Sequence, residues 1–295
     1  MAYLADLRAD RTDAQGKSKQ GISAQTSNFY LQDTKQFCRW MVRDRRASEN
    51  PLAYLQGLNV RLDRRHDRRA LSIEEMLWLL DITRKGPERY SISGPERALL
   101  YWLAVETGLR ANELASLTPL SFDLDGAHPT VTVAAAYSKH RRQDVLPLRP
   151  DMAAALRVFL ACKLPSVPAF KMPGGKRTSN MMRADLDYAR AAWLAESSTP
   201  QERKAREGTS FLSYVDGSDR YADFHALRHT FITNLARSGA HPKTAQTLAR
   251  HSTITLTMDY YTHTLQREQI AALSALPDLS TLRTSQSATQ MAALR

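Results

Sequence analysis

The chain has 295 residues, of which 43% are hydrophobic, and a formal net charge of +11 at pH 7. This length allows one large domain or two smaller ones, and the charge favours a polyanionic partner, although a basic protein without one is also possible. Two cysteines exclude a disulfide framework and a four-ligand zinc site, and no segment has the length of a signal core or membrane span, so a reducing cytoplasm is expected and a membrane partner is not.

The first part of the chain is predicted to be helical and basic. Residues 2–10 form a short amphipathic piece, and residues 23–46 carry apolar side chains at helical intervals with basic side chains between them. Pro51 indicates the start of another short helix. Residues 61–69 then contain five arginines and few apolar side chains, which predicts an exposed linker. We therefore expect a helical domain over residues 1–65, a second domain over 66–280, and a polar tail over 281–295.

The second part is predicted to mix helices with short strands. Ser72 and Glu75 form a capping box that opens a helix, and Gly94 and Pro95 start another helix, which stops at Gly108. A helix over 110–117 and three short strands within 118–148 follow. The remaining helices are predicted at 151–163, 178–206 (one helix or a pair), 224–238, 242–250, 255–261 and 265–276. The fold class is therefore mainly α with a small antiparallel β-sheet.

Several cationic side chains stand where they could meet an anion. His225 and Arg228 are three residues apart on a predicted helix and share a face, although they could also form a solvated polar surface. Arg110 lies at a helix start, where unpaired N–H groups attract anions and a guanidinium can clamp a phosphate. The alternative for Arg110 is an ion pair with Glu106 or Glu113. Lys139 lies in the turn between two strands, as a soluble turn residue or as a contact to a nucleic-acid groove.

His251 and the adjacent tyrosines Tyr260 and Tyr261 have ordinary structural interpretations when each is taken alone. Taken together, two arginines, a lysine, two histidines and a tyrosine suit phosphoryl transfer without a metal. Guanidinium and ammonium groups can then stabilise the charge on the phosphate oxygens. No carboxylate cluster or metal-ligand set stands out, so neither a metal nor a cofactor is predicted.

These residues resemble the tyrosine recombinases of the phage-integrase family over residues 72–275. The matching positions are Arg110 in TGLRANEL, Lys139 in the hairpin, His225 and Arg228 in HALRHTF, and His251 in ARHS. The N-terminal part resembles the family's core-binding domain more weakly, and it is short for the four helices usual there. A second departure is Arg250, which stands where the family usually has glycine.

The resemblance implies a site-specific recombinase that breaks and rejoins DNA without metal or ATP. A tyrosine attacks a phosphodiester, forms a 3′-phosphotyrosyl link and releases a 5′-hydroxyl. Arg110 and Arg228 would clamp the non-bridging oxygens, and Lys139 would be the general acid for the leaving oxygen. His225 would accept the tyrosine proton or bind the phosphate, and His251 would bind a phosphate oxygen.

The identity of the nucleophile depends on two neighbouring phenols. Family members place the nucleophile nine or ten residues after the histidine, and this spacing admits both tyrosines. The family's tyrosine is commonly followed by one residue and then a histidine, as in Tyr261-Thr262-His263. The sequence therefore predicts Tyr261 as the nucleophile and Tyr260 as a packing residue beside it.

The expected partner is double-stranded DNA, bound by a homo-tetramer on two DNA sites in the cytoplasm, at the nucleoid. The helix over 265–276 would dock on a neighbouring protomer or pack within its own chain. Alternative functions are a type IB topoisomerase or telomere resolvase, and a DNA-binding protein without catalysis. The residues predicted to contact DNA are Lys35, Arg39, Arg43, Arg61, Arg64, Arg65, Arg68, Arg69, Arg141 and Arg142.

Overall fold

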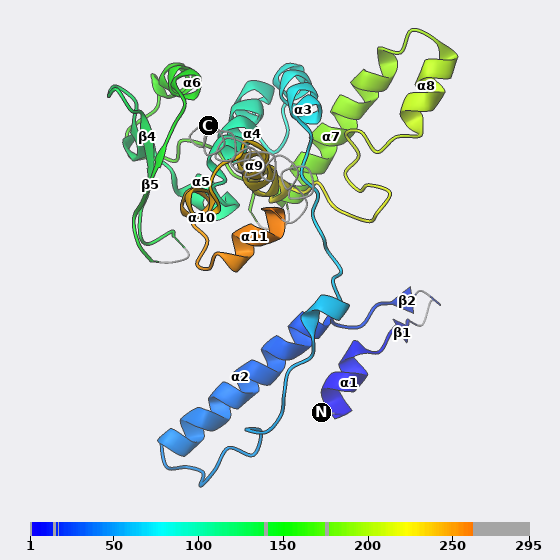
Figure 1. Ribbon diagram of the computed structural model, residues 1–295, viewed down its shortest axis with the longest axis vertical. Helices are drawn as coiled ribbons and strands as arrows, with labels where there is room; N and C mark the ends of the chain where they lie inside the picture. The colour runs from blue at the N-terminus through cyan, green and yellow to red at the C-terminus, as the bar shows by residue number, and fades with distance from the viewer. Residues whose placement is uncertain (1, 14–15, 17, 139–140, 175–176, 262–295) are drawn as a thin grey trace, which may run out of the picture. The chain divides into compact units, whose positions relative to one another are not determined.

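The computed structural model describes residues 2–13, 16, 18–138, 141–174 and 177–261 (Figure 1). Its contacts divide the chain into two units, Met1–Asp67 and Arg68–Arg295, whereas the sequence predicts the division after residue 65. The predicted tail over 281–295 and the predicted helix over 265–276 lie outside the described residues. In the part that is described, no helix has both the length and the apolar composition needed to cross a bilayer.

The first unit is built around one long helix. It contains α1 (Ala2–Arg8), the hairpin of β1 (Arg11–Thr12) and β2 (Ser18–Lys19), α2 (Ala24–Arg43) and the 3₁₀ turn η1 (Val60–Leu62). Ser23 caps α2 by accepting a hydrogen bond from Thr26 N. The predicted helix at Pro51 is wrong, because residues 51–54 form turns. The Asn50 side chain accepts from Leu52 N there, and Lys35 Nζ donates to Ala53 O and Leu55 O, which holds the returning loop against α2.

The second unit combines helices with one three-stranded antiparallel sheet, so the predicted fold class is confirmed. The sheet has the order β3 (Phe122–Asp123), β4 (Thr130–Val133) and β5 (Asp144–Pro147), and Val131 pairs with Leu146. The helices of this unit are α3 (Ile73–Lys85), α4 (Gly94–Thr107), α5 (Ala111–Ser116), α6 (Pro150–Leu160), α7 (Arg177–Ala195), α8 (Pro200–Glu207), α9 (Ala226–Arg237), α10 (Pro242–Ala249) and α11 (Thr255–Tyr261). A 3₁₀ turn, η2 (Pro119–Ser121), precedes β3.

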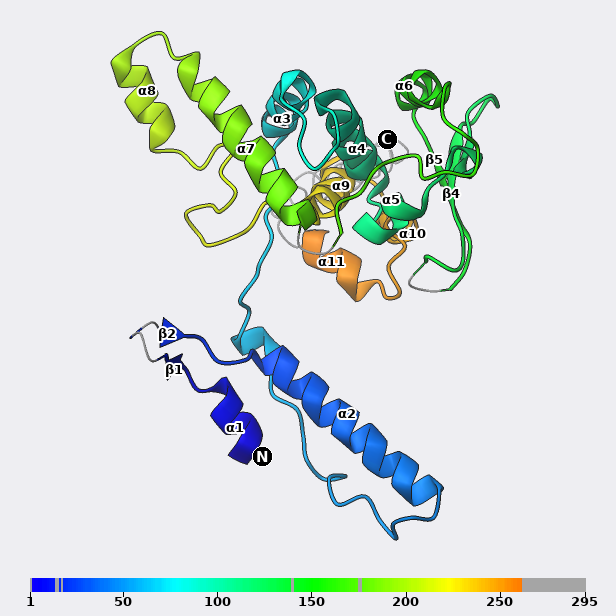
Figure 2. The same ribbon diagram turned by 180° about the vertical axis from the view of Figure 1, so that it is seen from behind.

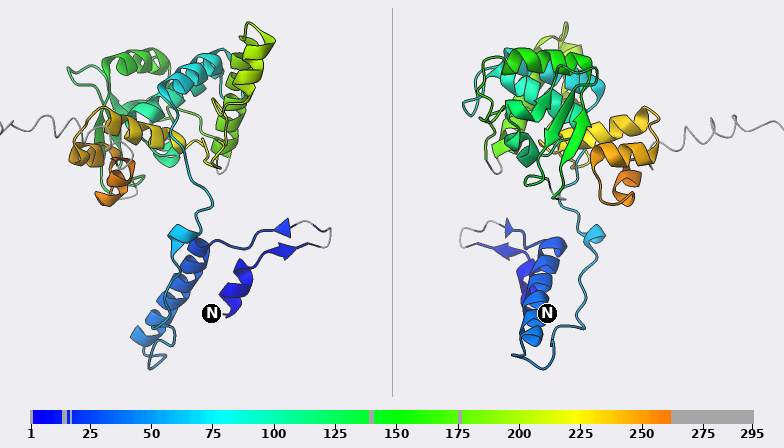
Figure 3. Two further views of the ribbon diagram at one scale, coloured as in Figure 1. Left: turned by 45° about the vertical axis from the view of Figure 1, so that its right-hand side comes forward. Right: turned by 90° about the vertical axis from the view of Figure 1, so that its left-hand side faces the viewer.

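One core joins the helices and the sheet of the second unit. Leu79 of α3, Leu100 and Leu103 of α4 and Leu227 of α9 are fully buried in the same cluster as Val131 of β4. The capping box predicted at Ser72 and Glu75 is present at the start of α3. Figure 2 shows α5 beside α10, and Figure 3 shows α9, α10 and α11 (yellow to orange) packed as one group. This core joins α4, α5 and α9, and two smaller clusters pack α10 and α11 against α9.

Candidate active site

The end of α4 and the start of α5 place Arg110 beside α9. Gly108 terminates α4 in the left-handed conformation, with φ of 61°. A Cβ on this residue would lie 2.4 Å from Phe231 Cδ1, so only glycine allows α4 to end this close to α9. Arg110 follows as the N-cap residue of α5, with its side chain partly exposed. The TGLR segment thus positions a guanidinium at the helix junction, as the sequence predicts.

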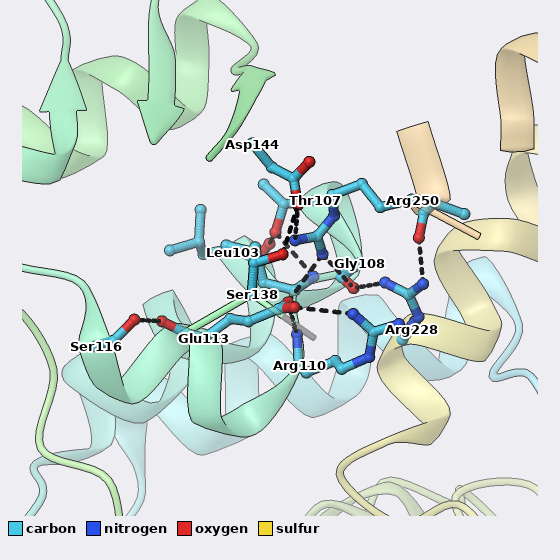
Figure 4. A network of polar contacts seen from close by, with 12 residues as sticks. Leu103, Thr107, Gly108, Arg110, Glu113, Ser116, Ser138, Asp144, Arg228 and Arg250 are labelled. Atoms are coloured by element: carbon cyan, nitrogen blue, oxygen red, sulfur yellow. Dashed lines mark hydrogen bonds and ion pairs between the residues drawn. The ribbon is translucent and has the colours of Figure 1, made fainter. Parts of the chain in front are cut away.

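Glu113 is a buried carboxylate that joins two guanidinium groups (Figure 4). Arg110 Nη1 donates to Glu113 Oε1 at 2.8 Å, and Arg250 Nη2 donates to Glu113 Oε2 at 2.9 Å. Burial raises the pKa of Glu113, but the guanidinium groups of Arg250 and Arg110 outweigh it, so the pKa lies below its ordinary value. Glu113 is therefore ionised near neutral pH, and it orients Arg110 by the ion pair that the sequence left open.

Arg228 lies on α9, only 3% exposed, with its guanidinium held by two backbone carbonyls. Its Nη1 donates to Gly108 O at 2.5 Å, and its Nη2 donates to Ala249 O. Desolvation and the neighbouring cations Arg110 and Arg250 lower the pKa of Arg228 to about 9. A pKa near 9 still leaves Arg228 charged at neutral pH, beside Arg110.

His225 and His251 are both held in the neutral form near the guanidinium groups. Desolvation, together with the charges of Arg68 and Arg228, lowers the pKa of His225 to about 4, although part of its side chain remains accessible to solvent. Desolvation followed by the charges of Arg228 and Arg110 lowers the pKa of His251 to about 4 as well. His251 Nδ1 lies 3.0 Å from Thr257 Oγ1 at the start of α11. At neutral pH each ring therefore keeps one nitrogen that can accept a proton.

The two tyrosines at the end of α11 have different surroundings. Tyr261 is 6% exposed, packs with Ala236 and Ala245, and donates its hydroxyl hydrogen bond to Ala240 O at 2.6 Å. The ring centroid of Tyr260 lies 4.8 Å from that of His229 and 6.5 Å from that of His251.

The cations of the site also affect the pKa of Tyr260. Burial raises its pKa to about 12, although the charges of Arg228 and Arg68 act in the opposite direction. Tyr261, in contrast, is anchored in the packing between α9 and α10. In the structure the ring of Tyr260 thus lies near the histidines and the Tyr261 hydroxyl is bound to Ala240 O, and the choice of nucleophile between them stays a prediction.

Lys139 lies outside the described residues, but the hairpin on either side of it is described. Ser138 is buried, and its hydroxyl donates to Asp144 Oδ2 at 3.1 Å at the start of β5. Tyr137 lines a hollow of about 400 Å³ together with Arg110, Ala111, Asn112 and Glu113. Tyr137, two residues before Lys139 in the sequence, thus lies next to Arg110.

Asp144 and the backbone carbonyls of Gly108 and Ala249 are parts of the site that the sequence did not reveal. The one signal for Asp144 is its place directly after the basic turn, since an acid there is a natural partner for the arginines. A carbonyl carries no signal in the sequence. Within the described part, no three His, Cys, Asp or Glu side chains lie together as metal ligands would.

The residues predicted to contact DNA fall into two groups. Arg69 is 8% exposed and donates to both Glu75 oxygens at 2.8 Å and to Ser213 O at 2.7 Å, so it is a structural residue rather than the predicted surface contact. Arg68 likewise binds Asp223, next to His225. Those with charged groups bound within the chain are Lys35, Arg64, Arg65, Arg68, Arg69 and Arg142. Of the first group, Arg64 and Arg142 are still largely exposed, and the exposed candidates outside that group are Arg39, Arg43, Arg61 and Arg141.

A comparison with known families matches residues 70–268 to the phage integrase family. Among curated proteins, the XerC-like tyrosine recombinase of Caldanaerobacter subterraneus is 26% identical over 64% of this chain, and the chain spans about half (51%) of that protein. Tyrosine recombinase XerC of Bacillus subtilis is 26% identical, over 89% of this chain and 77% of that protein. The transposase of transposon Tn916 from Enterococcus faecalis is 26% identical, over 88% of this chain and 63% of that protein.

Two solved structures with a similar fold are complexes with DNA. The integrase of transposon Tn1549, bound to transposon right end DNA, aligns with a TM-score of 0.52 and 15% identity, over 92% of this chain and 81% of that one. The XerH site-specific recombinase, in a post-cleavage complex with palindromic difH substrate, aligns with a TM-score of 0.56 and 16% identity, over 86% of this chain and 68% of that one. At these identities the likeness establishes the fold.

Proposed function

The chain belongs to the phage integrase family of tyrosine recombinases, and on that premise we propose that it breaks and rejoins DNA at specific sites through a 3′-phosphotyrosyl link. The observation that carries this proposal is the convergence of Arg110, Arg228, His251 and Tyr260 from four separate segments. Arg228 lies within electrostatic range of Arg110 and Tyr260, and the charges of Arg228 and Arg110 act on His251. Two guanidinium groups, a neutral imidazole and a phenol make up the inventory that a phosphodiester transfer needs.

In the proposed step the Tyr260 oxygen attacks the scissile phosphorus, and the bond from phosphorus to the 5′ oxygen breaks. The phenol must lose its proton, and a phosphate bound between Arg110 and Arg228 places both cations next to it. His225, neutral at physiological pH, is the proposed acceptor of that proton. Lys139 delivers a proton to the leaving 5′ oxygen, and His251 donates a hydrogen bond to a phosphate oxygen.

The reverse reaction uses the same groups. The phosphotyrosyl bond conserves the energy of the broken phosphodiester, so a 5′-hydroxyl from another strand can attack it and restore Tyr260. No ATP and no metal enters this sequence of steps. The partner is double-stranded DNA, and strand exchange would take place in a homo-tetramer on two DNA sites in the nucleoid.

The proposal is tested by trapping the covalent adduct on a nicked suicide substrate, from which the 5′-hydroxyl fragment diffuses away. The DNA is taken from the sequence that flanks the gene, and the reaction contains EDTA. We expect a protein–DNA adduct that survives denaturation, and no adduct with Arg110→Ala or Arg228→Ala. Cleavage that requires magnesium, or adduct formation unchanged in both arginine variants, would overturn the proposal. Relaxation of supercoiled DNA without strand exchange would instead indicate a topoisomerase.

A further inference from the structure

Arg250 is an unusual residue for its position in the backbone. It ends α10 in the left-handed conformation, with φ of 53° and ψ of 46°, where a side chain is disfavoured and glycine is the ordinary choice. The side chain does not extend into solvent, because Arg250 is only 2% exposed. A strained backbone and a buried guanidinium at one position indicate that contacts of the side chain compensate for both.

The guanidinium of Arg250 touches three segments that meet at the site (Figure 4). Its Nη2 donates to Glu113 Oε2 at 2.9 Å in α5 and to Gly108 O at 3.4 Å at the end of α4. Its Nη1 lies 3.9 Å from Asp144 Oδ2, at the start of β5. Both Nε and Nη1 are buried and have no hydrogen-bond partner among the described residues, so the group is held mainly by its charge.

The charges of this cluster explain what Arg250 adds. Glu113 Oε1 accepts a hydrogen bond from the Arg110 guanidinium, and Glu113 Oε2 accepts one from the Arg250 guanidinium. The negative charge of Glu113 is therefore shared between two cations. Three buried or half-buried guanidinium groups, those of Arg110, Arg228 and Arg250, face the two carboxylates of Glu113 and Asp144. Without Arg250, the one guanidinium that lies near both carboxylates would be lost, Asp144 would keep the exposed Arg142, and less positive charge would remain for a phosphate.

We propose that Arg250 is a positioning residue, which shares Glu113 with Arg110 and holds Asp144 at the base of the β4–β5 hairpin. Arg110 then keeps both its orientation and an unneutralised charge toward the scissile phosphate. The same group links the start of β5, through Asp144, to α5, through Glu113. This inference rests on the proposed recombinase function, and it assigns a role to the one residue that departs from the family's glycine next to His251.

The test is the rate of adduct formation at saturating DNA for Arg250→Gly and Arg250→Lys. The glycine variant should fold, because glycine fits the left-handed backbone. In this variant Glu113 still has its ion pair with Arg110, and Asp144 still has its hydrogen bond from Ser138 and its ion pair with Arg142. We expect its cleavage rate to fall about 10- to 100-fold, the loss typical when the partner of a functional group is removed. DNA affinity and Tm should stay close to those of the wild type. Arg250→Lys keeps the charge but not the planar fork, so its rate should lie between the two.

Two further variants separate this role from a general effect on the fold. Arg45→Gly is the matched control, because Arg45 also has a positive φ of 56° but lies exposed in the first unit, and its cleavage rate should not change. In a Glu113→Gln background, Arg250→Gly should lower the rate much less than in the wild type, since the two residues act together.

Three outcomes would overturn the inference. The first is a wild-type cleavage rate for Arg250→Gly, or for Arg250→Lys if the glycine variant does not fold. The second is a loss that follows only the fraction of unfolded protein, and the third is a loss of the same size in the Glu113→Gln background. If the wild-type chain itself forms no adduct, the proposed function fails, and this inference fails with it.

Discussion

At the scale of single residues, the site depends on which groups the fold exposes and which it ties down. Tyr260 and Tyr261 are neighbours in the sequence, yet the ring of Tyr260 lies beside those of His229 and His251, whereas the Tyr261 hydroxyl donates to Ala240 O. Arg228 and Arg250 are buried cations whose partners are backbone carbonyls and Glu113. The histidines are uncharged near neutral pH because desolvation, together with the neighbouring arginines, lowers their pKa.

The first prediction separates the two tyrosines. Tyr260→Phe removes the proposed nucleophile, so it should abolish the covalent adduct while leaving DNA binding intact. Tyr261→Phe removes the hydrogen bond to Ala240 O, so it should form the adduct with a destabilisation of about 1 kcal/mol. Mass spectrometry of the trapped peptide identifies the modified tyrosine. An adduct on Tyr261, or activity in Tyr260→Phe, would restore the interpretation drawn from the sequence.

The second prediction concerns stability as a function of pH. Histidines ordinarily titrate near 6.5, and His225 and His251 have a pKa of about 4 in the fold. Between these values the unfolded chain binds more protons than the folded chain, so the free energy of unfolding should fall as pH is lowered through this window. Urea unfolding at about pH 7 and about pH 5 measures the effect. His251→Gln should reduce the difference between the two values, and an unchanged difference would argue against a lowered pKa at His251.

At the scale of elements, the close meeting of α4, α5 and α9 is set by Gly108. In Gly108→Ala the added Cβ would clash with Phe231, and alanine would be strained in the left-handed backbone. The substitution should destabilise the chain by about 2–4 kcal/mol. Gly239→Ala is the control, because φ is 74° there but no atom lies within 4 Å of the added Cβ. Its effect should be limited to about 1–2 kcal/mol of backbone strain. Equal losses in thermal or denaturant unfolding would mean that Phe231 moves aside.

The helices could be predicted from the sequence because their starts and ends are marked locally. Ser72 with Glu75, Gly94 with Pro95, and Gly108 each act within one turn of the chain. The turn at Pro51 was mistaken for a helix because Asn50 and Lys35 hold it through contacts that spacing does not show. The candidate arginines and histidines were found from motifs, whereas the contacts of Asp144 and Arg250 join segments far apart in the sequence. The choice between Tyr260 and Tyr261 depends in the same way on how α11 packs, which the spacing of the sequence does not show.

At the scale of the whole molecule, the net charge of +11 must be divided between internal pairs and cations available to DNA. Arg69 belongs to the internal group, because it is buried against Glu75. Arg39 and Arg43 belong to the exposed group on α2. The arginines of residues 61–69 therefore do not all have charged groups that are available to DNA.

The fourth prediction follows from this division. If Arg39 and Arg43 contact phosphates, Arg39→Ala and Arg43→Ala should each lower the slope of log K against log salt by about 0.9. Arg69→Met should leave that slope unchanged and lower the Tm, because it leaves Glu75 without its partner. Fluorescence anisotropy over a salt series measures the slopes. A smaller slope for the Arg69 variant would place that residue on the DNA after all.

The anchoring of Tyr261 has a consequence for the register of α11. Successive residues of a helix point about 100° apart. The hydrogen bond from Tyr261 to Ala240 O therefore also determines the direction in which Tyr260 points. A deletion or insertion of one residue between His251 and Tyr260 would rotate the pair, and the phenol that now anchors the helix would take a different position. The number of residues in this stretch, more than their chemical type, therefore decides which tyrosine oxygen can meet the phosphate.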